Sequence, residues 1–277
     1  MSDFPDLYAF VVRLHTLDGA PAPRPQGHGA QALFLDLVGQ VAPDIAEQLH
    51  ADAPSKPYTV AILPRRSRAL VELRISLLRA DLFQPFVRAM LQQMPGEAPL
   101  RLGQARLRLG DVIGTPAPQG HPWAGYSSFA DLHSGAQPAH TVVLEFATAT
   151  AIGQGARPDG KQRLAVLPDP ALIFPSLAKR WNELAPTPLR LDPDAVRVAA
   201  ADTLVTRYRA GSTEINLGKG PQKGFVGIVA YELPTDEAQA RLLALLADAA
   251  LYLGVGMKTA RGMGLCRRLA EYDTGSA

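Results

Sequence analysis

Cysteine, long apolar runs and aromatic residues are all scarce in this sequence, and each scarcity excludes a class of structure. Cys266 is the one cysteine, which excludes an intramolecular disulfide and a multi-cysteine zinc site. The longest apolar stretch, residues 242–257, is interrupted by Asp248 and falls short of the roughly 20 residues of a membrane helix. The start MSDFPDLYAF lacks the basic and apolar regions of a signal peptide. We therefore expect a soluble, cytoplasmic protein that has no membrane partner.

An excess of charge of one sign is also missing from the whole chain, but not from its end. The 28 Lys and Arg residues against 26 Asp and Glu leave a formal net charge of +2. Residues 249–270 contain Lys258, Arg261, Arg267 and Arg268 and no acidic residue. Any anion binding must therefore come from local clusters such as this one. Because aromatic residues make up only 6% and show no RNP-type run, phosphate contacts are expected to outweigh base stacking in any RNA recognition.

The hydrophobic pattern predicts an alternation of strands and helices in two halves. In the first half we expect strands at 7–15, 58–63, 70–78 and about 100–113, and helices around 30–41, at 43–50 (PDIAEQLH) and at 81–93. Residues 114–139, rich in Gly, Pro, Ser and His, are predicted to be a connection. In the second half we expect strands at 141–152, near 195–209, at 225–233 and from about 262, and helices around 170–184 and at 236–253.

Both halves thus have the element order β-α-β-β-α-β. This order is typical of the ferredoxin-like fold, in which four antiparallel strands carry two helices on one face. We predict an α+β protein of tandem ferredoxin-like, RRM-like domains, residues 1–125 and 138–277. The last helix is the clearest element, with Thr235 predicted to cap it and Gly254 to end it.

After that helix comes GVGMKTARGMG, residues 254–264, in which four glycines surround two basic residues. It is not a nucleotide P-loop, because Met257 stands where glycine must precede Lys-Thr, and it is not G-x-G-x-x-G, because position 259 is threonine. Two interpretations stay open. The glycines form a tight turn with a sheet bulge, or they let backbone N–H groups approach phosphate while side chains add donors. The candidate residues are Gly254, Gly256, Lys258, Thr259, Arg261, Gly262 and Gly264.

The spacing G-V-G-x5-G-M-G resembles the glycine-rich loop of the RAMP superfamily of CRISPR proteins, and in particular its repeat-RNA processing endoribonucleases, the Cas-six family. Other segments resemble that family in the same order along the chain. They are PDIAEQLHADAPSKPYT, HPWAGYSSF, LPDPALIFPSLAKRWN and KGFVGIVAYEL. One feature differs, because the first helix reads Ala-Leu-Phe-Leu-Asp and lacks the tyrosine that some family members use in catalysis.

The resemblance implies cleavage of CRISPR repeat RNA without a metal or other cofactor, by attack of a ribose 2′-OH on the adjacent phosphate. The products would be a 2′,3′-cyclic phosphate and a 5′-OH. His50 matches the family's proton-transfer residue, and Lys56 is a candidate to stabilise the phosphorane charge. Lys219 and Lys223 in GKGPQKG, together with Arg267, are further candidates for RNA contact, although the two lysines also fit a solvated turn. His28, which precedes the first predicted helix, stays open as a second histidine.

Two alternatives to a ribonuclease follow from the same residues. A non-catalytic RAMP subunit of a CRISPR effector complex would share the fold and the glycine loop, but would not need His50 with Lys56. A small-molecule enzyme or regulatory module on ferredoxin-like domains is supported little by this loop. Repeat RNA is the expected partner, with other CRISPR effector subunits and a second copy of the chain as further candidates. No histidines or carboxylates show a metal-ligand spacing.

Overall fold

The computed structural model describes residues 5–17, 27–51, 55–64, 67, 69–93, 99–156, 158–160, 162–218 and 220–271. Its contacts divide the chain into two compact units, neither of which is one continuous segment. Unit 1 contains Met1–Ser128, Ile215–Pro221 and Thr259–Gly262, and unit 2 contains Phe129–Glu214, Gln222–Lys258 and Met263–Ala277. The glycine-rich segment therefore contributes residues to both units.

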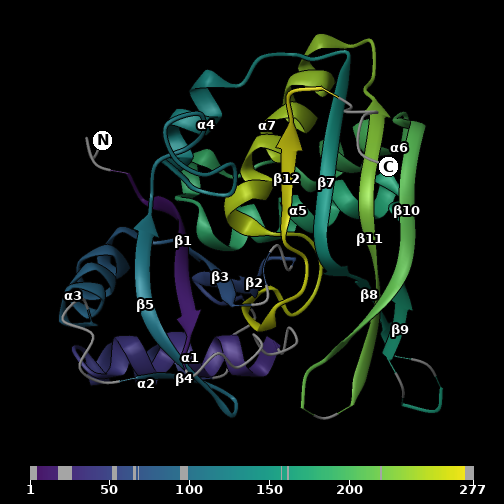
Figure 1. The fold of residues 1–277 in the computed structure, drawn as a ribbon. Helices are drawn as coiled ribbons and strands as arrows, with labels where there is room; N and C mark the ends of the chain where they lie inside the picture. The colour runs from purple at the N-terminus through teal and green to yellow at the C-terminus, as the bar shows by residue number, and fades with distance from the viewer. Residues whose placement is uncertain are drawn as a thin grey trace. The chain divides into compact units, whose positions relative to one another are not determined.

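Unit 1 is built on an antiparallel sheet of order β2-β3-β1-β5-β4, with β6 paired to β1 (Figure 1). Along β1, Phe10, Val12 and Leu14 lie on one side of the strand and pack into a core with the apolar side of the first helix. The strands are β1 (Leu7–Thr16), β2 (Tyr58–Ile62), β3 (Leu70–Leu77), β4 (Leu100–Leu102), β5 (Ala105–Ile113) and β6 (Gly125–Ser127). The helices are α1 (Gly27–Gly39), α2 (Pro43–His50), the short η1 (Ala80–Leu82), α3 (Phe83–Gln93) and, from the glycine-rich segment, η3 (Thr259–Arg261).

Unit 2 is built on an antiparallel sheet of order β10-β11-β7-β12, and the helices α5, α6 and α7 lie behind this sheet in Figure 1. Phe174 packs against Tyr231 with ring centroids 5.6 Å apart, which joins α5 to the sheet. The strands are β7 (Thr141–Thr150), β10 (Leu204–Asn216), β11 (Pro221–Glu232) and β12 (Cys266–Leu269), with a separate ribbon of β8 (Ile152–Ala156) and β9 (Gln162–Ala165). The helices are α4 (Phe129–Gly135), α5 (Pro170–Leu184), η2 (Thr187–Leu189), α6 (Pro193–Ala201) and α7 (Glu237–Leu253).

The two sheets share one strand order. With β4 and β6 set aside, the strands of each sheet can be numbered one to four in the order in which they occur along the chain. Across both sheets the spatial order is then second, third, first, fourth, that is β2-β3-β1-β5 and β10-β11-β7-β12. The α+β class and the antiparallel sheets agree with the prediction. The first sheet is larger than the predicted four strands, because residues 100–113 form a hairpin about Gly103 (φ 60°) and β6 adds to β1.

Three local predictions were wrong. The strand expected near 195–209 is α6 followed by β10, because Asp192 accepts a hydrogen bond from the Asp194 N–H at 2.9 Å and Pro193 starts a helix. The connection at 114–139 contains β6 and α4. Asp236 rather than Thr235 caps α7, by accepting from the Gln239 N–H at 2.9 Å. No helix in the described ranges is both long and apolar enough to cross a membrane.

Candidate functional site

His50 is the last residue of α2, as the sequence predicts. Pro43 starts this helix, the Ala51 N–H makes its last hydrogen bond to the Glu47 carbonyl at 2.9 Å, and the non-helical backbone of Ala51 (ψ 146°) ends it. The imidazole is exposed at this end. A histidine on a short, well-terminated helix is held in place by its backbone while its ring stays accessible.

Lys56 holds the same helix end. Its ammonium Nζ donates to the carbonyl oxygens of Leu49 at 2.9 Å and His50 at 3.2 Å, and also to that of Ala51. These carbonyls lie at the end of α2 and have no partner inside the helix. A cation there also interacts favourably with the negative end of the helix dipole. Lys56 is therefore engaged by the backbone that carries His50, and it fixes the position of that residue.

The His50 ring lines an open groove between α1 and α2. The groove has a volume of about 560 Å³. Its lining is Leu35, Asp36, Gly39 and Gln40 from α1 and Ala46, Glu47 and His50 from α2. The Gln40 amide donates to the Asp36 carboxylate at 3.2 Å, which orients one of the two acidic side chains. The groove thus presents the imidazole together with polar groups of both helices.

The glycines of residues 254–264 serve packing. A Cβ at Gly256 would lie 2.3 Å from the Ala151 carbonyl oxygen, and a Cβ at Gly262 would lie 2.8 Å from the Gly27 Cα. All four glycines have φ between 67° and 88°, a region that L side chains avoid. Gly254 ends α7 as predicted.

The glycine N–H groups already have acceptors within the protein. Gly254 donates to the Ala250 carbonyl at 3.0 Å, Gly262 to the Val60 carbonyl at 2.8 Å, and Gly264 to the Ala149 carbonyl at 3.0 Å. The N–H of Gly256 donates to the Ser176 hydroxyl at 3.0 Å. In this conformation the interpretation as a turn accounts for the backbone, and phosphate contact rests on side chains.

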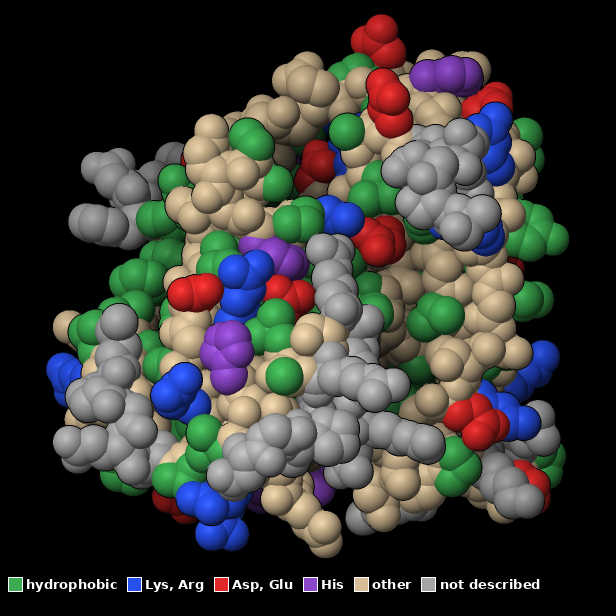
Figure 2. All heavy atoms as spheres, in the orientation of Figure 1, with side chains coloured by type: hydrophobic (Ala, Val, Ile, Leu, Met, Phe, Trp, Pro, Cys, Tyr) green, Lys and Arg blue, Asp and Glu red, His purple; other side chains and the backbone are tan. Residues whose placement is uncertain are grey.

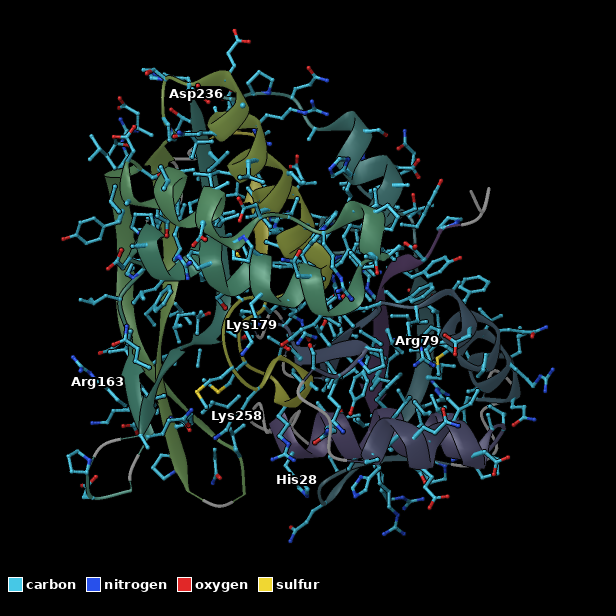
Figure 3. The ribbon with its side chains drawn as sticks, turned by 180° about the vertical axis from the view of Figure 1, so that it is seen from behind. His28, Arg79, Arg163, Lys179, Asp236 and Lys258 are labelled. Carbon is cyan, nitrogen blue, oxygen red and sulfur yellow. The ribbon has the colours of Figure 1, made fainter. Side chains whose placement is uncertain are left out.

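Two basic side chains of this segment are exposed. Lys258 has a left-handed backbone, φ 58°, and its Nζ donates to the Gln222 Oε1 at 2.8 Å; Figure 3 labels this lysine. Arg261 ends η3, and its Nε donates to the Gln31 Oε1 at 3.1 Å. Thr259 was predicted to be a donor to RNA, but it is only 3% exposed, so its hydroxyl is not available at the surface.

Within unit 1, His28, Arg261 and His50 follow one stripe of α1. His28 is exposed in the first turn of α1, where Figure 3 labels it. Arg261 is bonded to Gln31, and His50 shares its groove with Leu35. Residues 28, 31 and 35 are spaced i, i+3 and i+7, so they lie on one side of the helix, with about 5.4 Å between successive turns. We call His28, Arg261 and His50 the α1 stripe.

The other predicted residues lie differently. Arg267 donates from Nε to Glu145 at 2.7 Å, and Arg268 bonds Asp248 at 3.1 Å, so carboxylates balance both charges. Burial raises the pKa of Asp248, and Arg268 opposes that rise. Lys223 is exposed on β11. Lys219 lies outside the described residues.

A second cluster of ionisable groups lies over β1, where Figure 2 shows basic, acidic and histidine side chains together. Arg13 pairs with Glu72 at 3.1 Å and with Asp111 at 3.4 Å, and the His121 Nε2 lies 3.7 Å from Glu72. His121 is 5% exposed and its Nδ1 accepts from the Trp123 N–H at 3.1 Å. The charges compensate each other, so this cluster stabilises the sheet and is not an anion site. Among the described residues, no three His, Cys, Asp or Glu side chains are grouped so that they could hold a metal ion.

Comparison with known proteins gives the class to which this fold and site belong. The family model of CRISPR-associated endoribonuclease Cas6 matches residues 144–266. A Cas6 (TTHB231) product complex is 33% identical with a TM-score of 0.83, covering 96% of this chain and 100% of that chain. Thermus thermophilus Cas6 (TTHB231) is 30% identical with a TM-score of 0.75, covering 97% and 100%. The CRISPR-associated endoribonuclease Cas6 of Mycobacterium tuberculosis is 23% identical over 231 residues, which are 83% of this chain and 68% of the relative.

The class is therefore that of CRISPR-associated endoribonucleases, which are RNA-processing enzymes. With 33% identity over the full length of a solved member, the chain belongs to the Cas6 family and processes CRISPR RNA. The resemblance that the sequence indicates is thus confirmed, and so is the identification as an enzyme.

Sequence reasoning missed two residues next to the α1 stripe, Gln31 and Tyr58. Gln31 is 8% exposed and Tyr58 is fully buried. The available signal was a glutamine inside an otherwise apolar helix face, and a tyrosine that begins a fully buried strand.

Proposed function

We propose that this chain cleaves CRISPR repeat RNA without a metal ion. The 2′-oxygen attacks the neighbouring phosphorus, the bond from phosphorus to the 5′-oxygen breaks, and the ends are a 2′,3′-cyclic phosphate and a 5′-OH. The proton of the 2′-OH passes to a base and the departing 5′-oxygen takes a proton from an acid, so protein side chains suffice. The observation that carries this proposal is the α1 stripe, which sets two exposed histidines and an arginine along one helix.

In this proposal His50 transfers a proton at the scissile phosphate. It lines the groove and is accessible. Lys56 supplies positive charge behind it and keeps the helix end in position through its three carbonyl contacts. A similar structure, at 25% identity and TM-score 0.71, is a Cas6 (TTHA0078) substrate mimic complex, and another, at 26%, is a mutant of that protein in which a histidine is replaced by alanine.

The test is cleavage of a stem-loop repeat RNA in excess EDTA. We expect one discrete cut, at a rate unchanged by added magnesium. The upstream fragment should resist a phosphatase that does not open cyclic phosphates, and the downstream fragment should accept a phosphate from polynucleotide kinase without prior treatment. Loss of cleavage in EDTA with recovery in magnesium would contradict the metal-independent mechanism.

RNA backbone is proposed to contact Lys258 and Arg261, with Lys223 and Lys219 as further basic donors. We leave Arg267 out, because Glu145 holds its guanidinium. Replacing both Lys258 and Arg261 by alanine should weaken repeat-RNA binding by about 1.5 kcal/mol. It should also flatten the dependence of log Kd on log salt, because each phosphate contact contributes about 0.7–0.9 to that slope.

The matched control for this double variant is Lys179→Ala, which removes an exposed cation from α5 of unit 2 (Figure 3). It should leave the slope unchanged. Filter binding between about 50 and 200 mM salt covers the sensitive range. A slope that the double variant leaves unchanged would reduce the glycine-rich segment to a structural turn.

We further infer that the two units are tandem ferredoxin-like domains, with the continuous ranges 1–125 and 138–277 as their main segments. The shared strand order supports this inference, because it is the order that β-α-β-β-α-β produces when both outer connections cross the sheet.

We also propose that other CRISPR proteins and a second copy of the chain are partners. A Cas6-RT-Cas1–Cas2 complex contains a chain of similar fold, at 13% identity. The proposed location is the cytoplasm, where Cys266 stays an unreactive thiol because burial raises its pKa.

A further inference from the structure

A chain of hydrogen bonds runs from the interior of unit 1 to the exposed Arg261. The Gln31 Nε2 donates to the Tyr58 hydroxyl at 2.9 Å, and the Gln31 Oε1 accepts from the Arg261 Nε at 3.1 Å. Tyr58 is fully buried and Gln31 is 8% exposed, whereas Arg261 is exposed. A buried hydroxyl is thus connected to a surface guanidinium through one amide.

This arrangement leaves the amide a single orientation. The NH₂ group of Gln31 must face the tyrosine oxygen, because the arginine can only donate and so needs the amide oxygen. Tyr58 in turn packs against Phe34, with ring centroids 4.8 Å apart, at the start of β2. Burial raises the pKa of Tyr58, which keeps its hydroxyl neutral, while the bond from Gln31 and the charge of Arg261 oppose that rise.

The backbone of Arg261 is fixed as well. The Gly262 N–H bonds the Val60 carbonyl at 2.8 Å, and the Arg261 carbonyl lies so close to Gly27 that a Cβ there would be 1.7 Å away. The bond to Gln31 uses Nε, so the two Nη groups with their N–H donors are not consumed by this contact. A guanidinium fixed at both its backbone and its Nε presents those donors in one direction.

We propose that Gln31 and Tyr58 are positioning residues that hold Arg261 toward a phosphate of the repeat RNA. The inference rests on the proposed function of Arg261. An arginine side chain loses conformational entropy when it binds, and one that is already oriented loses less, so it binds RNA more tightly. Neither Gln31 nor Tyr58 needs to contact RNA for this effect.

A purely structural role for the Tyr58 hydroxyl differs in one measurable respect. A buried hydrogen bond that only stabilises the fold would affect RNA binding equally whether or not Arg261 is present. A positioning role acts through Arg261 and vanishes when that side chain is removed. The test is therefore a double-mutant cycle of Tyr58→Phe and Arg261→Ala, read as RNA affinity.

In the cycle, the full chain binds a repeat RNA with a 2′-deoxy group upstream of the cut. Tyr58→Phe should weaken binding about 3- to 10-fold, the effect of one hydrogen bond, in the background that keeps Arg261. In the Arg261→Ala background it should change binding less than about twofold. Gln31→Leu, which removes both hydrogen bonds, should give the same pattern. Thermal unfolding of every variant shows that each one folds.

The matched control is Tyr231→Phe in unit 2. That tyrosine is also fully buried, and its hydroxyl donates to the Pro168 carbonyl at 2.9 Å, with no link to Arg261. It should leave RNA affinity unchanged in both backgrounds. Equal losses from Tyr58→Phe in both backgrounds, or no loss in either, would overturn the positioning role. If Arg261→Ala alone leaves affinity unchanged, the proposed RNA contact of Arg261 is wrong, whatever the cycle gives.

Discussion

Replacing His50 by alanine is expected to slow single-turnover cleavage of repeat RNA by roughly 10²-fold or more, while RNA affinity changes only a few-fold. A proton-transfer group acts in the transition state and hardly in ground-state binding. The side chain is exposed at the end of α2, so its removal leaves the core of unit 1 intact. Cleavage is measured with protein in excess over labelled RNA, and affinity with the 2′-deoxy substrate.

Two comparisons make this result specific. His28→Ala removes the other histidine of the α1 stripe and should weaken binding more than it slows cleavage of bound RNA. Lys56→Ala releases the carbonyls at the end of α2, and should slow cleavage less than His50→Ala does, because it displaces the imidazole without deleting it. If the His50→Ala variant cleaves RNA at the wild-type rate, the proton-transfer residue lies outside this groove. Normal cleavage of the 2′-deoxy RNA would mean that the nucleophile is not the 2′-OH.

The second large effect is expected from Gly27→Ala, at the first residue of α1. A Cβ at this position would lie 1.7 Å from the Arg261 carbonyl oxygen and 2.8 Å from the Leu217 Cδ2, and the first of these atoms is backbone that cannot rotate away. We expect the free energy of unfolding to fall by about 3 kcal/mol, the upper range of overpacking. Because η3 must shift to make room, RNA affinity should fall as well. Urea denaturation and filter binding measure the two effects.

Gly39→Ala provides the matched control, since it places the same methyl group at the other end of the same helix. Its Cβ would meet only the Ala46 Cβ at 3.5 Å, an ordinary contact. This variant should be neutral or more stable by up to about 1 kcal/mol, because alanine loses less conformational entropy than glycine in a helix. Equal stability of the two variants would show that η3 does not pack on Gly27 as described.

Much of the fold follows from local sequence pattern. The helices expected at 43–50 and around 170–184 have these bounds in the structure, because proline starts both and their polar and apolar faces are distinct. The region 193–201, which contains Val196 and Val198, was assigned wrongly to a strand, whereas Asp192 and Pro193 are a helix start. A cap decides such a case more reliably than two valines do, since valine also occurs in helices.

The site was predictable only where its residues are close in sequence. His50 and Lys56 are six residues apart, and their contact closes one helix end. Gln31 and Tyr58 are 27 residues apart, and Arg261 lies 230 residues from Gln31. Only tertiary packing brings these three residues together, so no periodicity of the sequence indicates their contact. The use of the Gly256, Gly262 and Gly264 N–H groups was hidden for the same reason, because their acceptors lie on α5, β2 and β7.

The discontinuity of unit 1 has a consequence for when this unit can complete its folding during synthesis. Residues 259–262 belong to this unit, and the Gly262 N–H donates to the carbonyl of Val60 on β2, an edge strand of its sheet. On the ribosome, β2 is complete about 200 residues before residues 259–262, which lie against it, are synthesised. Until then the free edge of β2 can pair with strands of other nascent chains. The same delay means that Arg261 can take its place beside Gln31 only after a further 230 residues have been synthesised. A nascent chain therefore acquires its complete α1 stripe only once residue 261 has been synthesised, long after α1 and α2 are complete.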